Sequence, residues 1–169
     1  MDKLLRVMIG YSFGLRKDGF PTKSNSALAM WANTVNEMLA PDITILQTEI
    51  AECVNFNPSL IIKNHKRKNE YLDTEEVTVQ AVDFLKELIN QNEEYSLYVY
   101  IIAHQWLHWS KCMREVKKCL KKSEIKGNVI FIRGCIIPFD AKSDQWYTRG
   151  HIRALLYAIL QLMGKKTVN

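Results

Sequence analysis

Short apolar segments recur along the chain and predict the buried strands of a sheet. Each is four to seven residues long, contains Val, Ile or Leu, and is bounded by polar residues or glycine. Such segments are typical of strands in a parallel sheet that is covered on both faces. The four segments are residues 4–9, 43–46, 97–103 and 128–132. Residues 59–62 are either a further strand or a docking loop, and residues 47–58 show no clear pattern.

Between these segments, apolar residues recur at three- and four-residue steps, which is the period of one helix face. Ser24 or Asn25 is expected to cap the first helix, and Asp73 with Glu76 resembles a capping box at the second. The third helix is expected to begin near Gln105, and the last to run over residues 146–163. The predicted core positions are Leu28, Trp31, Ala32, Val35 and Leu39; Val77, Ala81, Phe84, Leu85 and Leu88; Trp106, Trp109, Met113, Val116 and Leu120; and Ile152, Leu155, Leu156, Ile159 and Leu162.

Strands and helices therefore alternate along the chain, with short connections and no internal repeat. This order predicts an α/β protein with a three-layer Rossmann-like fold, in which helices cover both faces of a mainly parallel sheet. At 169 residues the chain is expected to form a single domain, residues 1–169.

Composition is that of an ordinary globular protein, with 47% hydrophobic and 24% charged residues. The chain has no apolar run of about 18 residues, so we expect no membrane span. The first residues lack the features of a signal peptide. The four cysteines show no CxxC spacing and are expected to be reduced, mostly buried thiols of a cytoplasmic protein, with no metal site.

The net charge of +5 is concentrated in two lysine-rich stretches, residues 63–68 and 117–126. Such stretches could attract nucleic acid or another anionic partner. Neither contains the interleaved aromatic residues that single-strand binding requires, so we favour a solvated surface and no nucleic-acid partner.

The candidate chemistry lies where the strand 97–103 runs directly into the next helix. His104, Gln105, His108 and Lys111 follow this strand at once. In open α/β sheets, ligands bind just outside the carboxyl ends of the strands. We therefore expect these four residues to line a ligand site.

A second candidate is the loop after the first strand, which contains Gly10, Tyr11, Ser12, Gly14 and Lys17. Two glycines allow the backbone to bend tightly or to approach a ligand closely. The free amides of the loop could hold a phosphate or a carboxylate. The loop matches neither GxGxxG nor a P-loop, and it is equally explained as an ordinary turn.

These segments together resemble the YdcF-like family over nearly the whole chain. The segment from Ile9 to Gly14, with Asn25 beyond it, resembles the opening strand, glycine loop and first helix of that family. Thr74 and Glu76 match the family's S-x-N-T-x-E-N segment, with Val77 in place of its last Asn. The other similar stretches are His104-Gln-Trp-Leu-His108-Trp-Ser-Lys111, which is similar to T-S-x-x-H-x-x-R, and Pro138-Phe-Asp140 with Trp146 and a long terminal helix.

The chain also departs from the family pattern. Gln47-Thr48-Glu49 stands where the family has Ser-Gly-Gly, and Lys111 replaces the usual arginine and its bidentate fork. The resemblance implies a Rossmann-type domain. Some members act at the bacterial envelope and one is associated with S-adenosylmethionine, but no settled reaction carries over.

Two functions are consistent with these residues. The first is binding of a small molecule without turnover, the ligand being nucleotide-like, S-adenosylmethionine or phosphorylated. The second is a hydrolase or group-transfer enzyme, in which His108 is the general acid or base, Glu76 orients it and Lys111 holds an anion. Trp146 either lines the site or fixes the last helix. The candidate ligand-binding residues are Gly10, Tyr11, Ser12, Gly14, Lys17, Asn25, Thr74, His104, Gln105 and Trp146.

Overall fold

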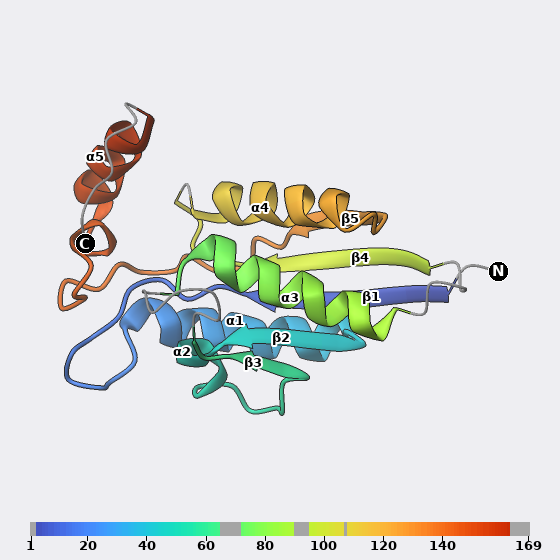
Figure 1. Ribbon diagram of the computed structural model, residues 1–169. Coiled ribbons are helices and arrows are strands. Elements are labelled where there is room, and N and C mark those ends of the chain that lie inside the picture. Colours follow the sequence, from blue (N-terminus) through green and yellow to red (C-terminus); the bar gives the residue numbers. More distant parts are fainter. Residues whose placement is uncertain (1–2, 65–71, 90–94, 107, 163–169) are drawn as a thin grey trace.

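A computed structural model describes residues 3–64, 72–89, 95–106 and 108–162. Its centre is a five-stranded sheet in the order β3-β2-β1-β4-β5, with every neighbouring pair parallel (Figure 1). The predicted parallel sheet is confirmed, and residues 59–62 contribute a strand rather than a docking loop. The strands are β1 (Lys3–Gly10), β2 (Ile43–Gln47), β3 (Leu60–Ile62), β4 (Tyr95–Ile102) and β5 (Gly127–Phe131).

Helices cover both faces of the sheet, which confirms the three-layer α/β fold. Helix α1 (Lys23–Leu39) and the short α2 (Thr48–Ala51) lie on one face. Helices α3 (Thr74–Leu88) and α4 (His108–Lys122) lie on the other. Because side chains alternate along a strand, each strand contributes to both layers.

The pairing of β1 with β4 shows how the alternation divides the core. Val7 pairs with Val99, and both pack in the layer of α3 and α4. Their neighbours Met8 and Tyr100 also pair, and Met8 packs in the layer of α1. Helices therefore cover both faces of β4 only along the part of the strand that lies beside α1.

The helix starts differ in detail from the sequence expectation. Helix α1 is capped by Thr22, whose Oγ1 accepts a hydrogen bond from the amide of Asn25 at 3.0 Å. Ser24 and Asn25 do not cap it, because both side chains are bound to more distant backbone. At α3 the prediction is confirmed, since Asp73 Oδ1 accepts from the Glu76 amide at 2.8 Å.

The third predicted helix begins later than expected. Helix α4 begins at His108 rather than near Gln105. Trp109 packs towards the sheet, with its ring stacked on Phe131 at 5.0 Å. Trp106 precedes the helix and is 38% exposed, so its assignment to the core was wrong. The loop after β4 therefore continues past Gln105, where the sequence pattern placed the start of the helix.

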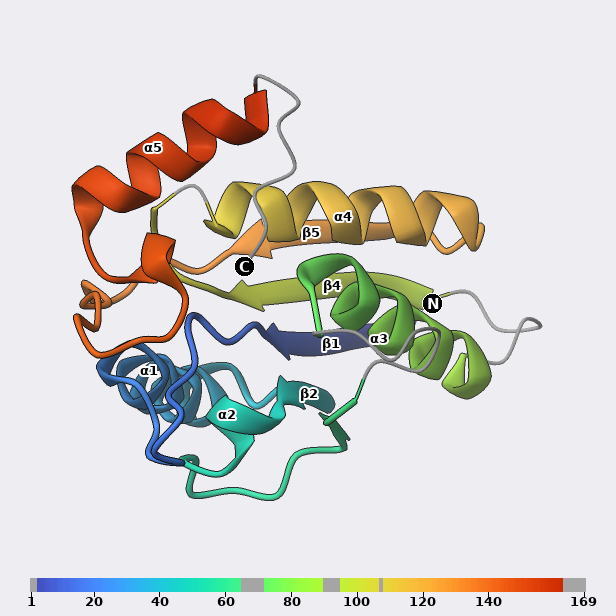
Figure 2. The same ribbon diagram turned by 60° about the vertical axis from the view of Figure 1, so that its left-hand side comes forward.

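The end of the chain departs most from expectation. Instead of one long helix over residues 146–163, a 3₁₀ turn η1 (Trp146–Thr148) precedes helix α5 (His151–Leu162). Helix α5 lies apart from the layers that cover the sheet (Figure 2). The exposed fractions of four predicted core residues are large: Ile152 77%, Leu155 50%, Leu156 49% and Ile159 44%. Their assignment to the core was wrong, because spacing identifies an apolar helix face but not the surface that covers it. The side chain of Leu162 and the expected cap Gly164 lie outside the description.

The remaining sequence expectations concern thiols, membranes and charge. All four cysteines are free thiols; Cys112 and Cys119 are buried, whereas Cys135 is exposed. Within the described ranges, no helix is long and apolar enough to cross a bilayer. Of the first lysine-rich stretch only Lys63 and Asn64 are described, and both are exposed. Residues 65–68 lie outside the description.

Candidate functional site

The carboxyl edge of the sheet between β1 and β4 is the topological switch point of the fold. From β1 the chain continues to β2 on one side, while β4 and β5 lie on the other. The residues that follow β1 and β4 meet here, and the Tyr11 amide donates to the Ile102 carbonyl at 2.9 Å. Ligands of open α/β sheets bind at such a point.

Phe13, from the loop after β1, brings the two histidines after β4 together. Its ring stacks on that of His104, with centroids 4.0 Å apart and planes inclined by 17°. The ring of His108 lies 5.3 Å away, tilted by 41°. We call His104, His108 and Phe13 the histidine cluster. The structure therefore joins the two histidines that the sequence placed near each other, and adds an aromatic residue between them.

Both histidines retain a buried ring nitrogen without a hydrogen bond. His104 is fully buried; its Nδ1 accepts from the Trp106 amide at 3.2 Å. Among the described residues, Nε2 of His104 and Nδ1 of His108 have no hydrogen-bond partner. Buried polar atoms are nearly always paired, so two such atoms beside one phenylalanine ring require an explanation.

Burial also determines the charge of the cluster. Burial lowers the pKa of His108 to about 3, with smaller contributions from the positive charges of Lys111 and His104. Burial lowers the pKa of His104 to about 4; the nearby Ile137 carbonyl opposes this change and His151 adds to it. Both rings are therefore neutral near pH 7, and each can donate from one nitrogen and accept at the other.

The first turn of α3 supplies the other polar groups beside His108. Thr74 Oγ1 lies 3.5 Å from His108 Nε2. The ring of Tyr11 meets that of His108 edge-on at 6.4 Å, and its hydroxyl lies 2.9 Å from Thr78 Oγ1. The sequence predicted Tyr11 and Thr74 as site residues, and the structure brings both to His108.

The other two proposed catalytic residues differ in their surroundings. Glu76 is buried, and its Oε1 accepts from Gln80 Nε2 at 2.8 Å. Thr74, not Glu76, is the α3 residue seen beside His108, so Thr74 is the better candidate to orient the ring. Lys111 is exposed on α4, one turn after His108, and its charge contributes to the lowered pKa of that histidine. It can therefore meet an anionic group at the entrance.

The glycine loop is not the free anion-binding loop that the sequence suggested. The Ser12 amide donates to Gln47 Oε1 at 3.1 Å, and the Phe13 amide donates to Asn25 Oδ1 at 2.7 Å. Gly10 is needed for packing, because a Cβ there would lie 2.6 Å from Leu46 Cδ2. These amides and Gly10 are already used by the fold. Ser12 itself remains half-buried at the edge of the site.

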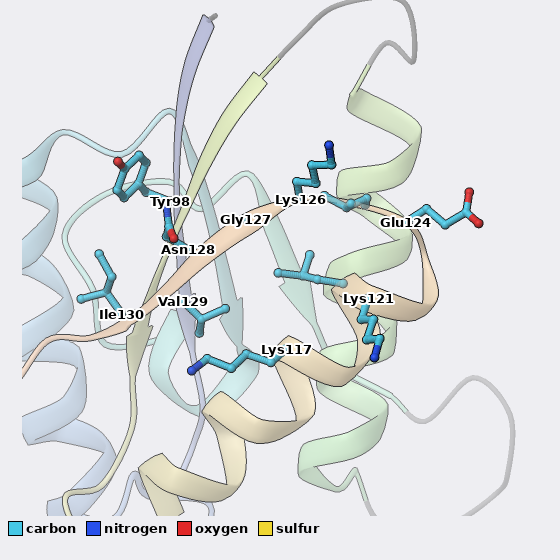
Figure 3. Close-up of a pocket in the computed structure, with 11 residues that line it drawn as sticks. Tyr98, Lys117, Lys121, Glu124, Lys126, Gly127, Asn128, Val129 and Ile130 are labelled. Carbon is cyan, nitrogen blue, oxygen red and sulfur yellow. The ribbon is translucent and has the colours of Figure 1, made fainter.

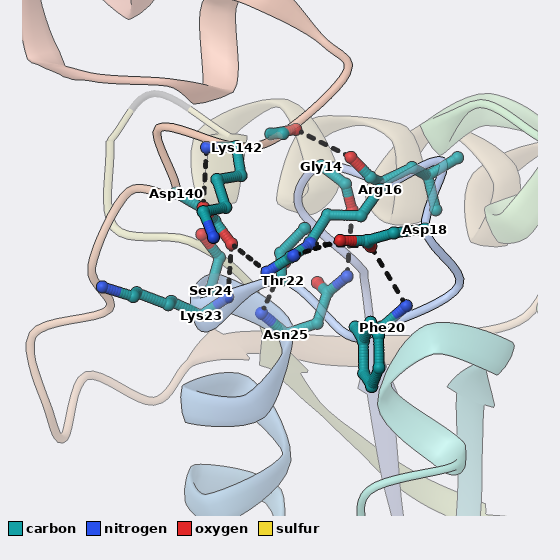
Figure 4. A network of polar contacts seen from close by, with 12 residues as sticks. Gly14, Arg16, Asp18, Phe20, Thr22, Lys23, Ser24, Asn25, Asp140 and Lys142 are labelled. Carbon is teal, nitrogen blue, oxygen red and sulfur yellow. Dashed lines mark hydrogen bonds and ion pairs between the residues drawn. The ribbon is translucent and has the colours of Figure 1, made fainter.

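Asn25 and Gly14 belong to a separate polar network beside the histidine cluster (Figure 4). Asn25 Nδ2 donates to the Gly14 carbonyl at 2.9 Å. Asp140 Oδ2 accepts from the Lys23 amide at 2.9 Å, and its Oδ1 accepts from the Lys142 amide at 2.8 Å. We call this network, centred on Asn25 and Asp140, the clasp. It joins the loop after β1, the start of α1 and the chain after β5.

Three more predicted ligand residues serve other contacts. Gln105 uses both ends of its amide on Ile137, donating to the carbonyl at 2.8 Å and accepting from the amide at 3.0 Å. Trp146 meets Tyr157 edge-on at 6.1 Å, which favours its structural role in fixing the last helix. Lys17 is exposed in the loop between β1 and α1.

Sequence reasoning missed the aromatic wall and one acidic residue of this edge. Phe139 packs on His104 at 4.6 Å and on the exposed His151 at 4.5 Å. Glu49, after β2, has a buried Oε2 with no hydrogen-bond partner among the described residues. Burial raises the pKa of Glu49, and its own amide and Ser12 oppose this change. The position of Glu49 directly after a strand was the available signal.

Neither metal-ligand groups among the described residues nor comparison with known proteins identifies the site. Within the described ranges, no three His, Cys, Asp or Glu side chains are grouped so that they could hold a metal ion. No family model, curated protein or solved structure matches this chain. The function must therefore be argued from the geometry of the site itself.

Proposed function

We propose that this chain is a small-molecule-binding domain of the YdcF-like type, which holds its ligand at the carboxyl edge of the sheet between β1 and β4. One observation carries the proposal. Four buried side-chain atoms lack a hydrogen-bond partner among the described residues, and one of them, Arg6 Nε, lies within β1. The other three, Glu49 Oε2, His104 Nε2 and His108 Nδ1, belong to residues that follow the strands at this edge. A bound ligand would satisfy polar atoms that the described protein leaves unpaired.

The chemistry of the cluster narrows the ligand class. A neutral imidazole pairs with an uncharged polar edge, such as that of a nucleobase or a sugar hydroxyl, at a smaller desolvation penalty than a charged group. Phe13 and Phe139 offer aromatic rings beside it. Lys111 supplies the exposed positive charge that a phosphate or carboxylate would meet. These features together favour a nucleotide-like ligand, S-adenosylmethionine or a phosphorylated molecule.

The lowered pKa of His108 favours binding over catalysis. A general base works best when its pKa lies near the working pH, and a value of about 3 makes a weak base. The enzyme alternative, a hydrolase or transferase with His108 as acid or base, requires a substrate whose negative charge raises that pKa. The free thiols are consistent with a cytoplasmic location.

A thermal-shift and calorimetry panel of nucleotides, S-adenosylmethionine and sugar phosphates tests the proposal. A ligand at about 100 times its dissociation constant adds roughly 2.7 kcal/mol, which raises Tm by several degrees. We expect His108→Ala to remove the shift, while Met38→Ala, at an exposed residue near the end of α1, retains it. Lys111→Ala should weaken only ligands with an anionic group, and Lys117→Ala is its matched control on α4.

Two results would count against the proposal. If no member of the panel stabilises the wild type, the proposed ligand class is wrong. If His108→Ala binds as well as the wild type, the ligand binds elsewhere. If the ligand that binds is also converted, and His108→Ala keeps its affinity but loses turnover, the enzyme alternative is correct.

A further inference from the structure

Among the described residues, no helix covers the α1-side face of the β4–β5 half of the sheet. Parallel sheets are ordinarily covered on both faces. Here β4 and β5 are covered by α4 on one side, but beside α1 their side chains reach the surface. Tyr98 pairs with Asn128, and Tyr100 with Ile130; all four side chains lie on the α1 side of the sheet. Ile130 is 38% exposed. We call Tyr98, Tyr100, Asn128 and Ile130 the open face.

The side chains of the open face are partly or fully exposed beside α1. Trp31 of α1 closes its carboxyl end, where Nε1 donates to the Ile132 carbonyl at 3.0 Å. Met38, seven residues later on the same side of α1, is 71% exposed. A cavity of about 890 Å³ lies along β5, and Lys117, Lys121, Glu124 and Lys126 line its α4 side. Tyr98 and Ile130 lie on the side of the strand away from Lys117 (Figure 3). No side chain of the open face is charged.

Helix α5 shows the converse feature, because its apolar side chains are exposed and do not pack on the sheet. Its exposed apolar residues Ile152, Leu155, Leu156 and Ile159 follow steps of three, one and three, and so form a single stripe. We call these four residues the α5 stripe. At 12 residues, α5 is about 18 Å long, close to the roughly 17 Å of the five-residue β5.

Contacts at other positions of α5 hold it away from its own open face. The ring of Tyr157 stacks on Tyr147 at 4.1 Å. His151, at the start of α5, meets Trp106 at 4.8 Å and Phe139 at 4.5 Å. The helix stands apart from the other helices, beyond the carboxyl end of β4 (Figure 1). The chain therefore has both an exposed apolar helix and an uncovered apolar sheet face.

We propose that the protein forms a symmetric dimer in which α5 of each copy packs its stripe on the open face of the other. Each chain has one exposed apolar helix, α5, and one uncovered sheet face, the open face. A reciprocal exchange therefore buries both α5 stripes and both open faces of the dimer. A two-fold dimer repeats the contact, so each partner contributes both a helix and a sheet face to the interface. This inference is independent of the proposed ligand.

Sedimentation velocity on the full chain, from low micromolar to about 100 μM, tests the dimer. We expect Leu155→Glu and Ile130→Glu each to raise the dimer dissociation constant at least tenfold, because each places a charge in an apolar contact. Their controls are matched in residue type and exposure: Leu88→Glu at 51% and Ile61→Glu at 38%, which should leave the dimer intact. Far-UV circular dichroism checks that each variant is folded.

Mixing the two dissociated variants tests the reciprocal geometry. The Leu155→Glu chain keeps a sound open face and the Ile130→Glu chain a sound α5 stripe, so the mixture should form a heterodimer through one intact contact. Several results would overturn the proposal. They are a wild type that stays monomeric throughout, a dimer that survives Ile130→Glu but not Leu155→Glu and so pairs helix with helix, and a monomer that binds anionic lipid vesicles through α5.

Discussion

The clasp and the histidine cluster lie side by side at the carboxyl edge of one sheet, yet their polar groups are treated in opposite ways. In the clasp, both ends of the Asn25 amide and both Asp140 oxygens are hydrogen-bonded. In the histidine cluster, His104 and His108 each retain a buried nitrogen with no partner among the described residues. Complete pairing contributes to stability, and incomplete pairing lowers it unless a ligand completes the set. This contrast distinguishes the structural network from the candidate site.

The largest expected effect breaks the clasp. Asn25→Ala leaves the Phe13 amide and the Gly14 carbonyl buried and unpaired, so we expect the free energy of unfolding to fall by about 4 kcal/mol. Urea unfolding measures the change. Asn33→Ala is the matched control: Asn33 Oδ1 accepts only from the Asn55 amide, at an exposed site, and its loss should stay within about 0.5 kcal/mol. Equal losses in the two variants would show that the clasp is not a stabilising network.

The next largest effect separates the cost of backbone strain from the cost of a steric clash in the loop between β1 and α1. Gly14→Ala forces a side chain onto φ +83° and places its Cβ 2.6 Å from Ser143 Oγ, so we expect a loss of about 3 kcal/mol. Gly19→Ala has a similar φ of +75° but nothing within 4 Å, and should lose only about 1 kcal/mol. Thermal and urea denaturation give the difference, and its absence would mean that the loop can move away from Ser143.

A smaller effect concerns the pH dependence of the histidine cluster. The unfolded chain protonates its histidines near pH 6.5, whereas the folded pKa values are about 4 for His104 and about 3 for His108. Between these values the unfolded state binds more protons, so stability is complete above pH 6.5 and is lost as the pH falls. From pH 7.5 to 5.5 we expect the wild type to lose about 2 kcal/mol more than the His104→Gln/His108→Gln double variant. Parallel pH profiles of the two would argue against neutral, buried rings.

The smallest expected effect comes from comparing one buried polar residue of the histidine cluster with one of the clasp. His104 and Asn25 are both almost fully buried polar residues. His104→Phe removes the unpaired Nε2 and keeps a ring against Phe13, but it also removes the Nδ1 that accepts from the Trp106 amide, so at pH 7 we expect a loss of about 1 kcal/mol. If the proposed site is correct, the same variant loses ligand binding. A loss as large as that of Asn25→Ala would show that His104 is structural.

Much of the fold followed from local pattern. The strands at residues 4–9, 43–46, 97–103 and 128–132 and the cap at Asp73 were predictable because alternation of apolar segments and helical periods leaves few arrangements other than a parallel sheet. The start of α1 was less predictable, because Thr22, Ser24 and Asn25 are all good caps by type. Only the distant backbone that binds Ser24 and Asn25 decides among them.

The candidate site was predictable in position but not in detail. His104 and His108 follow β4 directly, so the rule for parallel sheets located them. The same rule could not reveal that Gln105 and the glycine-loop amides are already bound, or that Phe13 lies between the histidines. Hydrogen-bond partners far apart in sequence are not encoded in local spacing.

The sequence by itself determined the class of fold, the edge at which chemistry is expected and the apolar stripe of the last helix, because each depends on local period and order. Only the tertiary structure decided which polar groups are satisfied and what each apolar face meets. The α5 stripe illustrates the reason, since its spacing is the same whether the helix packs on its own sheet, on a second copy or on nothing. Pairing and coverage are properties of the whole fold, and they separate the clasp from the site.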